Sequence, residues 1–359
     1  MQTQSKTLDF DGQNIYVGFD VHLKSWKVTI MTDELILKTF SQPPEPEVLH
    51  NYLQKNFPGG IYHSAYEAGY SGYWIHNNLV NLGIHSIVVN PADIPTTNKE
   101  KVQKDDKRDS RKIAKALRSG DLVPIYVPSS KTLEDRYLIR ARGLLVKDLT
   151  RNKNRIKSFL YFHGIKYPPS FENSKTHWSK RFVDWLEGIE MKEDTSKLTL
   201  SILVSEGKKL RSTILNVTRS IKELSQTVAY QEEERLLRSV PGIGALTAMI
   251  ILTEIETIAR FRNTDHFHSF VGIVPSTRSS GEDDKVGEIT PRGHGTLRSA
   301  IIESSWIAAR IDPALTKSFH EYCKRMEPNK AIVRIAKKLL NRISFVLKTK
   351  QSYRLSVLK

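Results

Sequence analysis

The sequence of 359 residues contains one cysteine, Cys323. A single thiol excludes an internal disulfide and any zinc site built from several cysteines. No stretch approaches the roughly 20 consecutive apolar residues that span a bilayer, and residues 1–14 are polar, so we expect neither a membrane segment nor a signal peptide. The sequence also shows no helix-turn-helix and no zinc finger for reading base edges.

Acidic residues are outnumbered: 39 Asp and Glu face 55 Lys and Arg, a formal net charge of +16. This excess indicates a polyanionic partner, nucleic acid first and an anionic membrane surface second. The charge is concentrated, since 18 basic and 8 acidic residues lie between Lys99 and Lys157, a local net charge of +10. The length allows two or three domains.

Residues 14–89 predict an α/β domain built on a mixed sheet. We expect strands at residues 14–20, 26–31, 35–40, 61–66 and 84–89, and helices at residues 44–56 and 72–82. Asp20 and Glu67 each come at the end of an expected strand, where α/β sheets present functional residues.

The stretch Lys104–Arg118 predicts a basic helix. Asp106 and Asp109 are three residues apart and share one face of it. Neighbouring carboxylates attract a divalent cation, and the cations around them attract phosphate. The candidate phosphate-binding cations here are Lys104, Lys107, Arg108, Arg111 and Lys112. Taken alone, the stretch is read more simply as a solvated helix start whose acids suit the helix dipole.

Asp20, Glu67, Asp106 and Asp109 together form a candidate site for Mg²⁺ or Mn²⁺. Each alone is read more simply as a surface charge. One acid after the first strand, one after the fourth and a pair on a later helix is the order of a ribonuclease-H-type fold. In such sites, two ions about 4 Å apart activate the nucleophile and stabilise the leaving group. Asp105 competes with Asp106, because a residue four before Asp109 also shares its face.

Two long helices are expected next, at about residues 133–162 and 198–235. Apolar residues recur along each at spacings of three and four, and Asn152 is a polar position within the first stripe. The stripes predict an antiparallel helical hairpin or a coiled coil between chains; an ordinary helix-bundle core is the alternative.

Pro241-Gly242-Ile243-Gly244 separates two further expected helices. This arrangement resembles a helix-hairpin-helix, in which the turn around Gly242 and Gly244 presents backbone N–H groups to a phosphate. A plain helix–helix turn fits the residues equally well. From Asn329 onward the pattern predicts a basic amphipathic helix.

Residues 276–282 are expected to form a polar loop that carries Ser280 beside Gly281. Four basic side chains lie near this serine in the sequence: Arg278, Arg292, His294 and Arg298. Cations would lower the serine pKa and stabilise the charge that develops on an attacked phosphodiester. From residue types alone, however, Ser-Gly is more simply an ordinary loop.

The motifs taken in order resemble one family over nearly the whole chain. Gly-Phe-Asp-Val at Asp20, Tyr-Glu-Ala-Gly-Tyr-Ser-Gly at Glu67 and Asp-Lys-Arg-Asp at residues 106–109 resemble the RuvC-like N-terminal domain of DEDD insertion-sequence transposases. Ser-Val-Pro-Gly-Ile-Gly at residues 239–244, Ser280-Gly281 and Gly-His-Gly-Thr-Leu-Arg at residues 293–298 resemble the C-terminal transposase domain of the same family.

The resemblance implies a RuvC-like DEDD catalytic domain at residues 1–128, a helical hairpin or coiled coil at residues 129–232 and a mainly α transposase domain at residues 233–359. It favours Asp106 over Asp105 as the third Mg²⁺-binding acid, and it implies that Ser280 is the nucleophile. Acids of one protomer and the serine of another would form a composite site in a dimer or a tetramer assembled on DNA.

The resemblance also implies the partners and the setting. These would be donor and target DNA and a structured non-coding RNA that guides the choice of DNA, as in bridge recombinases, in the cytoplasm and nucleoid of a prokaryote. Base pairing would then carry the sequence information. One rival is a junction-resolving endonuclease that cuts with metal-activated water. The other is a basic nucleic-acid-binding scaffold without catalysis.

Overall fold

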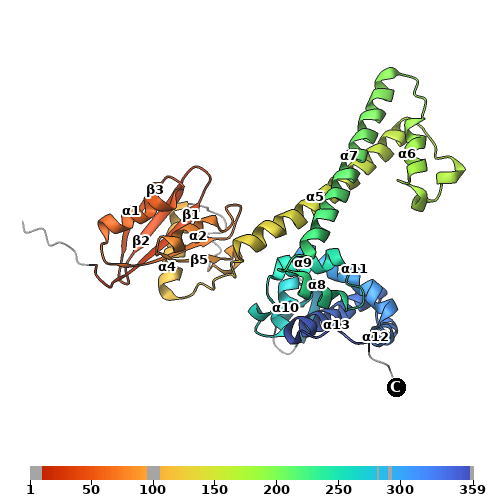
Figure 1. The fold of residues 1–359 in the computed structure, drawn as a ribbon. Coiled ribbons are helices and arrows are strands. Elements are labelled where there is room, and N and C mark those ends of the chain that lie inside the picture. The colour runs from red at the N-terminus through yellow and green to blue at the C-terminus, as the bar shows by residue number, and fades with distance from the viewer. Residues whose placement is uncertain (1–9, 95–105, 281–282, 290–292, 356–359) are drawn as a thin grey trace, which may run out of the picture. The chain divides into compact units, whose positions relative to one another are not determined.

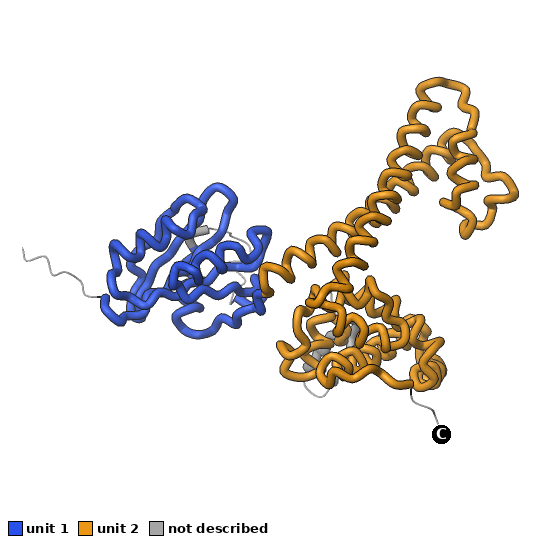
Figure 2. The backbone as a smooth tube through the Cα atoms, in the orientation of Figure 1, with its two compact units in different colours: residues 1–127 blue, residues 128–359 orange. Residues whose placement is uncertain are grey.

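The computed structural model describes residues 10–94, 106–280, 283–289 and 293–355, with the side chains of residues 106–107, 275–280 and 283–289 left undescribed. The chain divides into two compact units, Met1–Val127 and Pro128–Lys359 (Figure 2). Each unit is described by itself. No helix in these residues is both long enough and apolar enough to cross a membrane.

Unit 1 is built on a mixed sheet of five strands in the order β3-β2-β1-β4-β5 (Figure 1). The strands are β1 (Asn14–Val21), β2 (Trp26–Met31), β3 (Ile36–Gln42), β4 (Ile61–Glu67) and β5 (His85–Val89). The first three pair antiparallel, whereas β1 with β4 and β4 with β5 pair parallel. All five predicted strands are confirmed to within two residues at each end, because the β-branched and aromatic runs are clearly bounded by turns.

Helices cover both faces of this sheet. Val17 and Phe19 of β1 share a buried cluster with Leu53 of α1 (Pro46–Asn56) and Leu79 of α2 (Trp74–Asn81). The opposite face is covered by α4 (Asp106–Ser119), which packs on β1, β2 and β4. The architecture is consistent with the ribonuclease-H-like fold that the acid order predicts.

Unit 2 begins with a helical hairpin of α5 (Ser130–Phe162) and α7 (Asp194–Ser225), with α6 (Lys180–Glu187) between them in the chain (Figure 1). The pairing is antiparallel. The Tyr230 hydroxyl, just after α7, donates to Asp135 near the start of α5, and Asn152 farther along α5 donates to the carbonyl of Leu203. The two stripes therefore pack against each other within one chain.

The prediction of one helix over residues 198–235 was wrong. The chain leaves the helix after Ser225, and five residues separate it from the start of α8 (Gln231–Arg238). Tyr230 is the reason: it is buried, and its hydroxyl lies 2.7 Å from Asp135 Oδ2, which holds the chain in a turn. Val228, predicted on the stripe, is 89% exposed.

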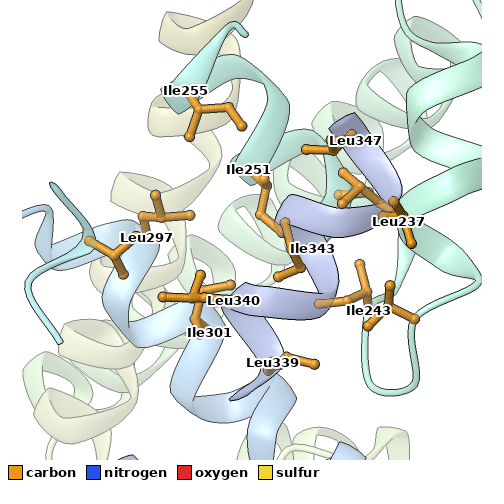
Figure 3. Packing of buried hydrophobic residues seen from close by; sticks show 14 of the residues in the cluster. Leu237, Ile243, Ile251, Ile255, Leu297, Ile301, Leu339, Leu340, Ile343 and Leu347 are labelled. Atoms are coloured by element: carbon orange, nitrogen blue, oxygen red, sulfur yellow. The ribbon is translucent and has the colours of Figure 1, made fainter. Parts of the chain in front are cut away.

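The C-terminal part of unit 2 is a helical core around α13 (Pro328–Thr349). Leu340 and Ile343 of α13 pack among Ile251 of α9 and Ile301 of α11 (Figure 3). The helices of this part are α8, α9 (Ala245–Ile255), α10 (Thr264–Val271), α11 (Gly295–Ile311), α12 (Pro313–Cys323) and α13.

The expected polar loop at residues 276–282 was wrong over the residues described. Residues Pro275–Ser280 form β6, which pairs antiparallel with β7 (Asp283–Ile289). The segment is polar but rich in Ser and Thr, and in a two-stranded ribbon the ladder satisfies the backbone hydrogen bonds without an apolar face.

Candidate functional site

Two of the four predicted acids end neighbouring parallel strands. Asp20 is the next-to-last residue of β1, and Glu67 is the last residue of β4. One residue before each acid, Phe19 pairs with Tyr66 in the parallel register. Asp20 and Glu67 therefore lie at the same edge and on the same face of the sheet, on backbones roughly 5 Å apart.

Helix α4 lies across this face with its N-terminus toward the acids. Near its start, the Ser110 hydroxyl lies 2.9 Å from the hydroxyl of Thr29 on β2, opposite Gly18 of β1. At its end, Arg118 donates to the carbonyl of Asp33, in the turn beside the start of β1. The helix thus runs opposite to β1, and its first turn comes to the edge that carries Asp20.

Gly18 allows helix α4 to lie this close. A Cβ at Gly18 would stand 2.2 Å from the backbone nitrogen of Ala114 and 2.4 Å from the carbonyl oxygen of Ser110. Any other residue would push the helix away from the sheet. This close approach fixes the position of Asp109, one residue before Ser110.

The acids at this edge already have basic neighbours. Asp20 lies 3.1 Å from the His22 ring, and Asp109 lies 3.9 Å from the Lys112 ammonium. Their side chains are 26% and 31% exposed. The side chain of Asp106 is outside the described residues, as is all of Asp105.

Within the described part of the chain, no three His, Cys, Asp or Glu side chains are grouped closely enough to hold a metal ion. The oxygen donors at this edge nevertheless suit a hard divalent cation. Mg²⁺ typically takes one or two carboxylates and completes its shell with substrate phosphate and water. The edge fits an ion that binds together with a phosphodiester better than a preformed protein cage.

The cations predicted to bind phosphate in and just before α4 have different surroundings. Arg108 and Arg111 are exposed, and Arg111 Nε donates to the Thr39 hydroxyl at 3.1 Å. Lys112 is the ion-pair partner of Asp109. Lys104 and the side chain of Lys107 lie outside the described residues.

The predicted nucleophile Ser280 is the last residue of β6 and pairs with Asp283, the first residue of β7. It therefore stands where the two-stranded ribbon turns. The side chains of Ser280 and Arg278, and all of Arg292, lie outside the described residues.

Close backbone contacts hold the base of this ribbon. Gly272 ends α10 in the left-handed conformation, at φ +80°. A Cβ on Gly293 would lie 2.5 Å from the Cα of Gly272. The segment that leads into the ribbon and the segment that follows it are therefore in close backbone contact. His294 N donates to the carbonyl of Phe270, and Arg298 donates to the carbonyl of Gly272. The ribbon carrying Ser280 therefore rises from a fixed base.

Glu254 links this base to α5. Its side chain is 1% exposed and accepts two hydrogen bonds from Arg140, at 2.9 and 2.8 Å. Arg136 Nε lies 3.3 Å from Glu254 Oε2, and His294 Nε2 lies 3.0 Å from the same oxygen. Three helices, α5, α9 and α11, are joined at one buried carboxylate.

Burial alone would raise the pKa of Glu254, but hydrogen bonds from His294 and Arg140 and the charges beside it lower the pKa to about 2. The carboxylate is therefore ionised throughout the physiological pH range. Two arginines and a histidine around one buried anion leave net positive charge beside the ribbon base.

The contacts of His294 select one ring tautomer. Its Nδ1 accepts from the backbone N–H of Leu297, as an N-cap of α11. The ring proton must then be on Nε2, which donates to Glu254. Both ring nitrogens of His294, a residue predicted to bind phosphate, therefore take part in contacts within the protein.

The two glycines of the predicted helix-hairpin-helix differ. Gly242 has φ +88°, and a Cβ there would stand 2.3 Å from the carbonyl oxygen of Ser304 on α11, so its role is close packing. Gly244 is the N-cap of α9 and has open space around it. It borders a cavity of about 540 Å³ that Thr247 and Arg310 also line. Gly242 lines the same cavity, and the binding of phosphate at this turn stays a prediction.

Sequence reasoning missed Glu254, Arg136 and Arg140. One signal was available: Glu254 is the single charged residue of α9, in an otherwise apolar or hydroxyl-bearing run. An acid in such a helix needs a buried partner. The spacing of Arg136 and Arg140 by four residues puts them on one face of α5, ready to supply it.

Comparisons with known proteins agree with both units. Residues 17–164 match the transposase family model DEDD_Tnp_IS110, and residues 234–321 match the model of the Transposase IS116/IS110/IS902 family. The transposase for insertion sequence element IS1533 of Leptospira borgpetersenii is 29% identical over 268 residues, covering 72% of this chain and 74% of the relative.

Two further relatives align over similar lengths. The transposase for insertion sequence element IS1111A of Coxiella burnetii is 24% identical over 299 residues, 80% of this chain and 77% of its own. A transposase relative from Sinorhizobium fredii is 28% identical over 253 residues, 70% of this chain and 60% of its own. The chain therefore belongs to the IS110 family of transposases, which are DNA strand-transfer enzymes.

Proposed function

We propose that this transposase cuts and joins DNA through a covalent intermediate on Ser280. The serine Oγ attacks a phosphorus atom of the DNA backbone, a new O–P bond forms, and the bond to the leaving sugar oxygen breaks. The serine proton passes to a base and the leaving oxygen gains a proton. Attack by the hydroxyl of a second strand reverses the reaction and joins new ends, so no energy source is needed.

The observation that carries this proposal is the shared edge of Asp20, Glu67 and the first turn of α4. The residues that would hold Mg²⁺ or Mn²⁺ are Asp20, Glu67, Asp106 and Asp109. Bound there, the ion would supply Lewis-acid stabilisation of charge on the phosphoryl oxygens.

The ribbon base supports the role of Ser280. Glu254 accepts a hydrogen bond from His294, and Arg298 donates to the carbonyl of Gly272, so the base of the ribbon that carries Ser280 is held in place. We propose Arg278 and Arg292 as further phosphate contacts.

The DNA would be held by exposed cations of α4 and by the N-terminus of α9 at Gly244. We further propose that a structured non-coding RNA directs the choice of donor and target DNA, and that acids and serine from different protomers complete each site in a dimer or tetramer. The net charge of +16 supports holding more than one strand.

The decisive variants are Ser280→Ala and Glu67→Gln, with Ser279→Ala as the matched control on the same strand. A recombination assay run on denaturing gels reports both activity and protein–DNA adducts. We expect Ser280→Ala to abolish adduct and product, and Glu67→Gln to reduce both at least about 100-fold. Ser279→Ala should retain activity. Active Ser280→Ala, or free DNA ends without an adduct in the wild type, would favour a junction-resolving endonuclease.

The RNA partner has a separate test. Sequencing of RNA that copurifies with the protein should return one abundant, structured species from the flank of its own element. A random mixture of cellular RNA would contradict the guide-RNA proposal and leave the serine chemistry untouched.

A further inference from the structure

A cavity of about 620 Å³ lies at the far end of the helical hairpin, where α6 and the segment before it pack against α5 and α7. This volume is within the range of sites that enclose small organic groups. One wall is apolar and includes Ile156, Val183 and Val204. The cavity lies in unit 2 and contains none of the residues proposed for strand transfer.

Cations also line the cavity. Lys153, Lys180 and Arg211 line it, with Asp184 as the neighbouring acid, while the fourth cation, Lys208, is paired with Glu187. Burial lowers the pKa of Lys153, and the charges of Arg211 and Lys157 lower it further. Among the described residues, no carboxylate forms an ion pair with Lys153 or Arg211. Positive charges that crowd one another in this way favour an anionic ligand.

Trp178 adds an aromatic surface. The Lys153 ammonium lies 5.2 Å from the centre of a Trp178 ring, and Arg211 donates to the Trp178 carbonyl at 3.0 Å. Trp178 also has φ +65°, an uncommon conformation for a bulky residue. Backbone strain of this kind persists only where surrounding contacts fix it.

Asn152 supplies a hydrogen-bond acceptor. It is 2% exposed, its Nδ2 donates to the Leu203 carbonyl at 3.1 Å, and its Oδ1 has no hydrogen-bond partner among the described atoms. Gly207 makes room for that oxygen, since a Cβ there would lie 2.7 Å from it. A buried acceptor needs a donor, and a ligand N–H can supply one.

We propose that this cavity binds one unpaired nucleotide of a single-stranded nucleic acid. Its phosphate would contact Lys153 and Arg211, and its base would lie against Trp178 with an N–H directed at Asn152 Oδ1. A phosphate beside an aromatic ring, an apolar wall and a single acceptor matches all parts of a nucleotide. A free inorganic anion would leave the acceptor and the apolar wall unused.

The test uses the full-length protein and a 15-nucleotide single strand that carries fluorescein and one 5-iodouracil, in ribo and deoxyribo forms. Ultraviolet cross-linking and peptide mass spectrometry should recover the label on the peptide containing Trp178. A ribo strand that binds and cross-links better identifies RNA as the source, and the reverse identifies DNA. Cross-links confined to other peptides would overturn the proposal.

Fluorescence anisotropy then separates the cavity from general charge. Trp178→Leu should raise the Kd of the single strand about fivefold or more, and Trp178→Phe should restore it. Arg211→Ala should weaken binding several times more than Lys209→Ala, a matched exposed cation of α7 outside the cavity. Circular dichroism checks folding of each variant. Equal effects of Arg211→Ala and Lys209→Ala, or equal binding of a blunt duplex, would overturn the proposal.

Discussion

The two units hold their important carboxylates in opposite ways. Glu254 in unit 2 is 1% exposed and has two arginines and a histidine around it. Asp20 and Asp109 in unit 1 are about a quarter to a third exposed, with His22 at 3.1 Å from Asp20 and Lys112 at 3.9 Å from Asp109. The carboxylate oxygens of Glu254 are enclosed by protein donors, whereas the carboxylates of Asp20 and Asp109 are partly exposed to solvent and can take further ligands.

This difference separates structure from chemistry. A buried carboxylate with complete partners stabilises the fold and is lost to catalysis, because it has no lone pair left for substrate. Acids at a strand edge contribute little to stability and can accept a cation together with phosphate. The experiments below test whether the two sets separate in this way.

The largest expected difference is in stability. Glu254→Ala leaves Arg136 and Arg140 beside an empty anion position and should destabilise unit 2 by about 3–5 kcal/mol. Asp109→Ala should change stability by about 1 kcal/mol or less. Urea unfolding followed by circular dichroism measures both. If Asp109→Ala proves as destabilising as Glu254→Ala, the edge acid is structural and the comparison fails.

The pH dependence of the free energy of unfolding should show the contribution of the ionised Glu254 carboxylate. Its pKa is about 2 in the folded protein against an ordinary 4.5. A carboxyl with a lowered folded pKa stabilises the protein above its unfolded pKa, and this contribution is lost as pH falls from about 4.5 toward 2. At 1.36 kcal/mol per pKa unit the full loss is roughly 3 kcal/mol.

The matched variant for this experiment is Glu254→Gln, which keeps the shape and removes the charge. Urea midpoints between pH 6 and pH 3 should fall further for the wild type than for Glu254→Gln. Parallel curves for the two proteins would show that Glu254 is not the group that titrates.

The smallest expected effect on stability concerns the packing of α4 against Gly18. Gly18→Ala should destabilise unit 1 by about 1–3 kcal/mol, because the new methyl would overlap the backbone of Ala114. It should also lower strand-transfer activity, since α4 carries Asp109. Gly69→Ala is the control, with open space at its Cβ and no left-handed φ, and should change little. Full activity in a folded Gly18→Ala protein would show that the position of α4 is not critical.

The sequence alone predicted the five strands and the positions of Asp20 and Glu67 at strand ends, because these signals are local. Alternating apolar residues give the strands, and parallel neighbours bring Asp20 and Glu67 to one edge. The packing of α4 against Gly18 could not be predicted from the sequence, because it depends on a contact between residues 18 and 114, which are far apart in the chain.

Tertiary contacts also explain the errors and omissions. Residues 198–235 have continuous helical spacing, and only the bond from Tyr230 to Asp135 reveals the break. Arg140 and Glu254 are 114 residues apart, so their pairing has no local pattern. The roles of Asp20, Glu67, Asp106, Asp109 and Ser280 stay predictions.

The most direct test of the account is to identify the residue that carries the DNA. A suicide substrate nicked beside the cleavage site would trap the intermediate, and nuclease digestion followed by peptide mass spectrometry would locate the remaining nucleotide. The account predicts a phosphodiester on Ser280 that is absent from Ser280→Ala and greatly reduced in Glu67→Gln. A nucleotide on any other residue, or cleavage with no attached nucleotide, would contradict it.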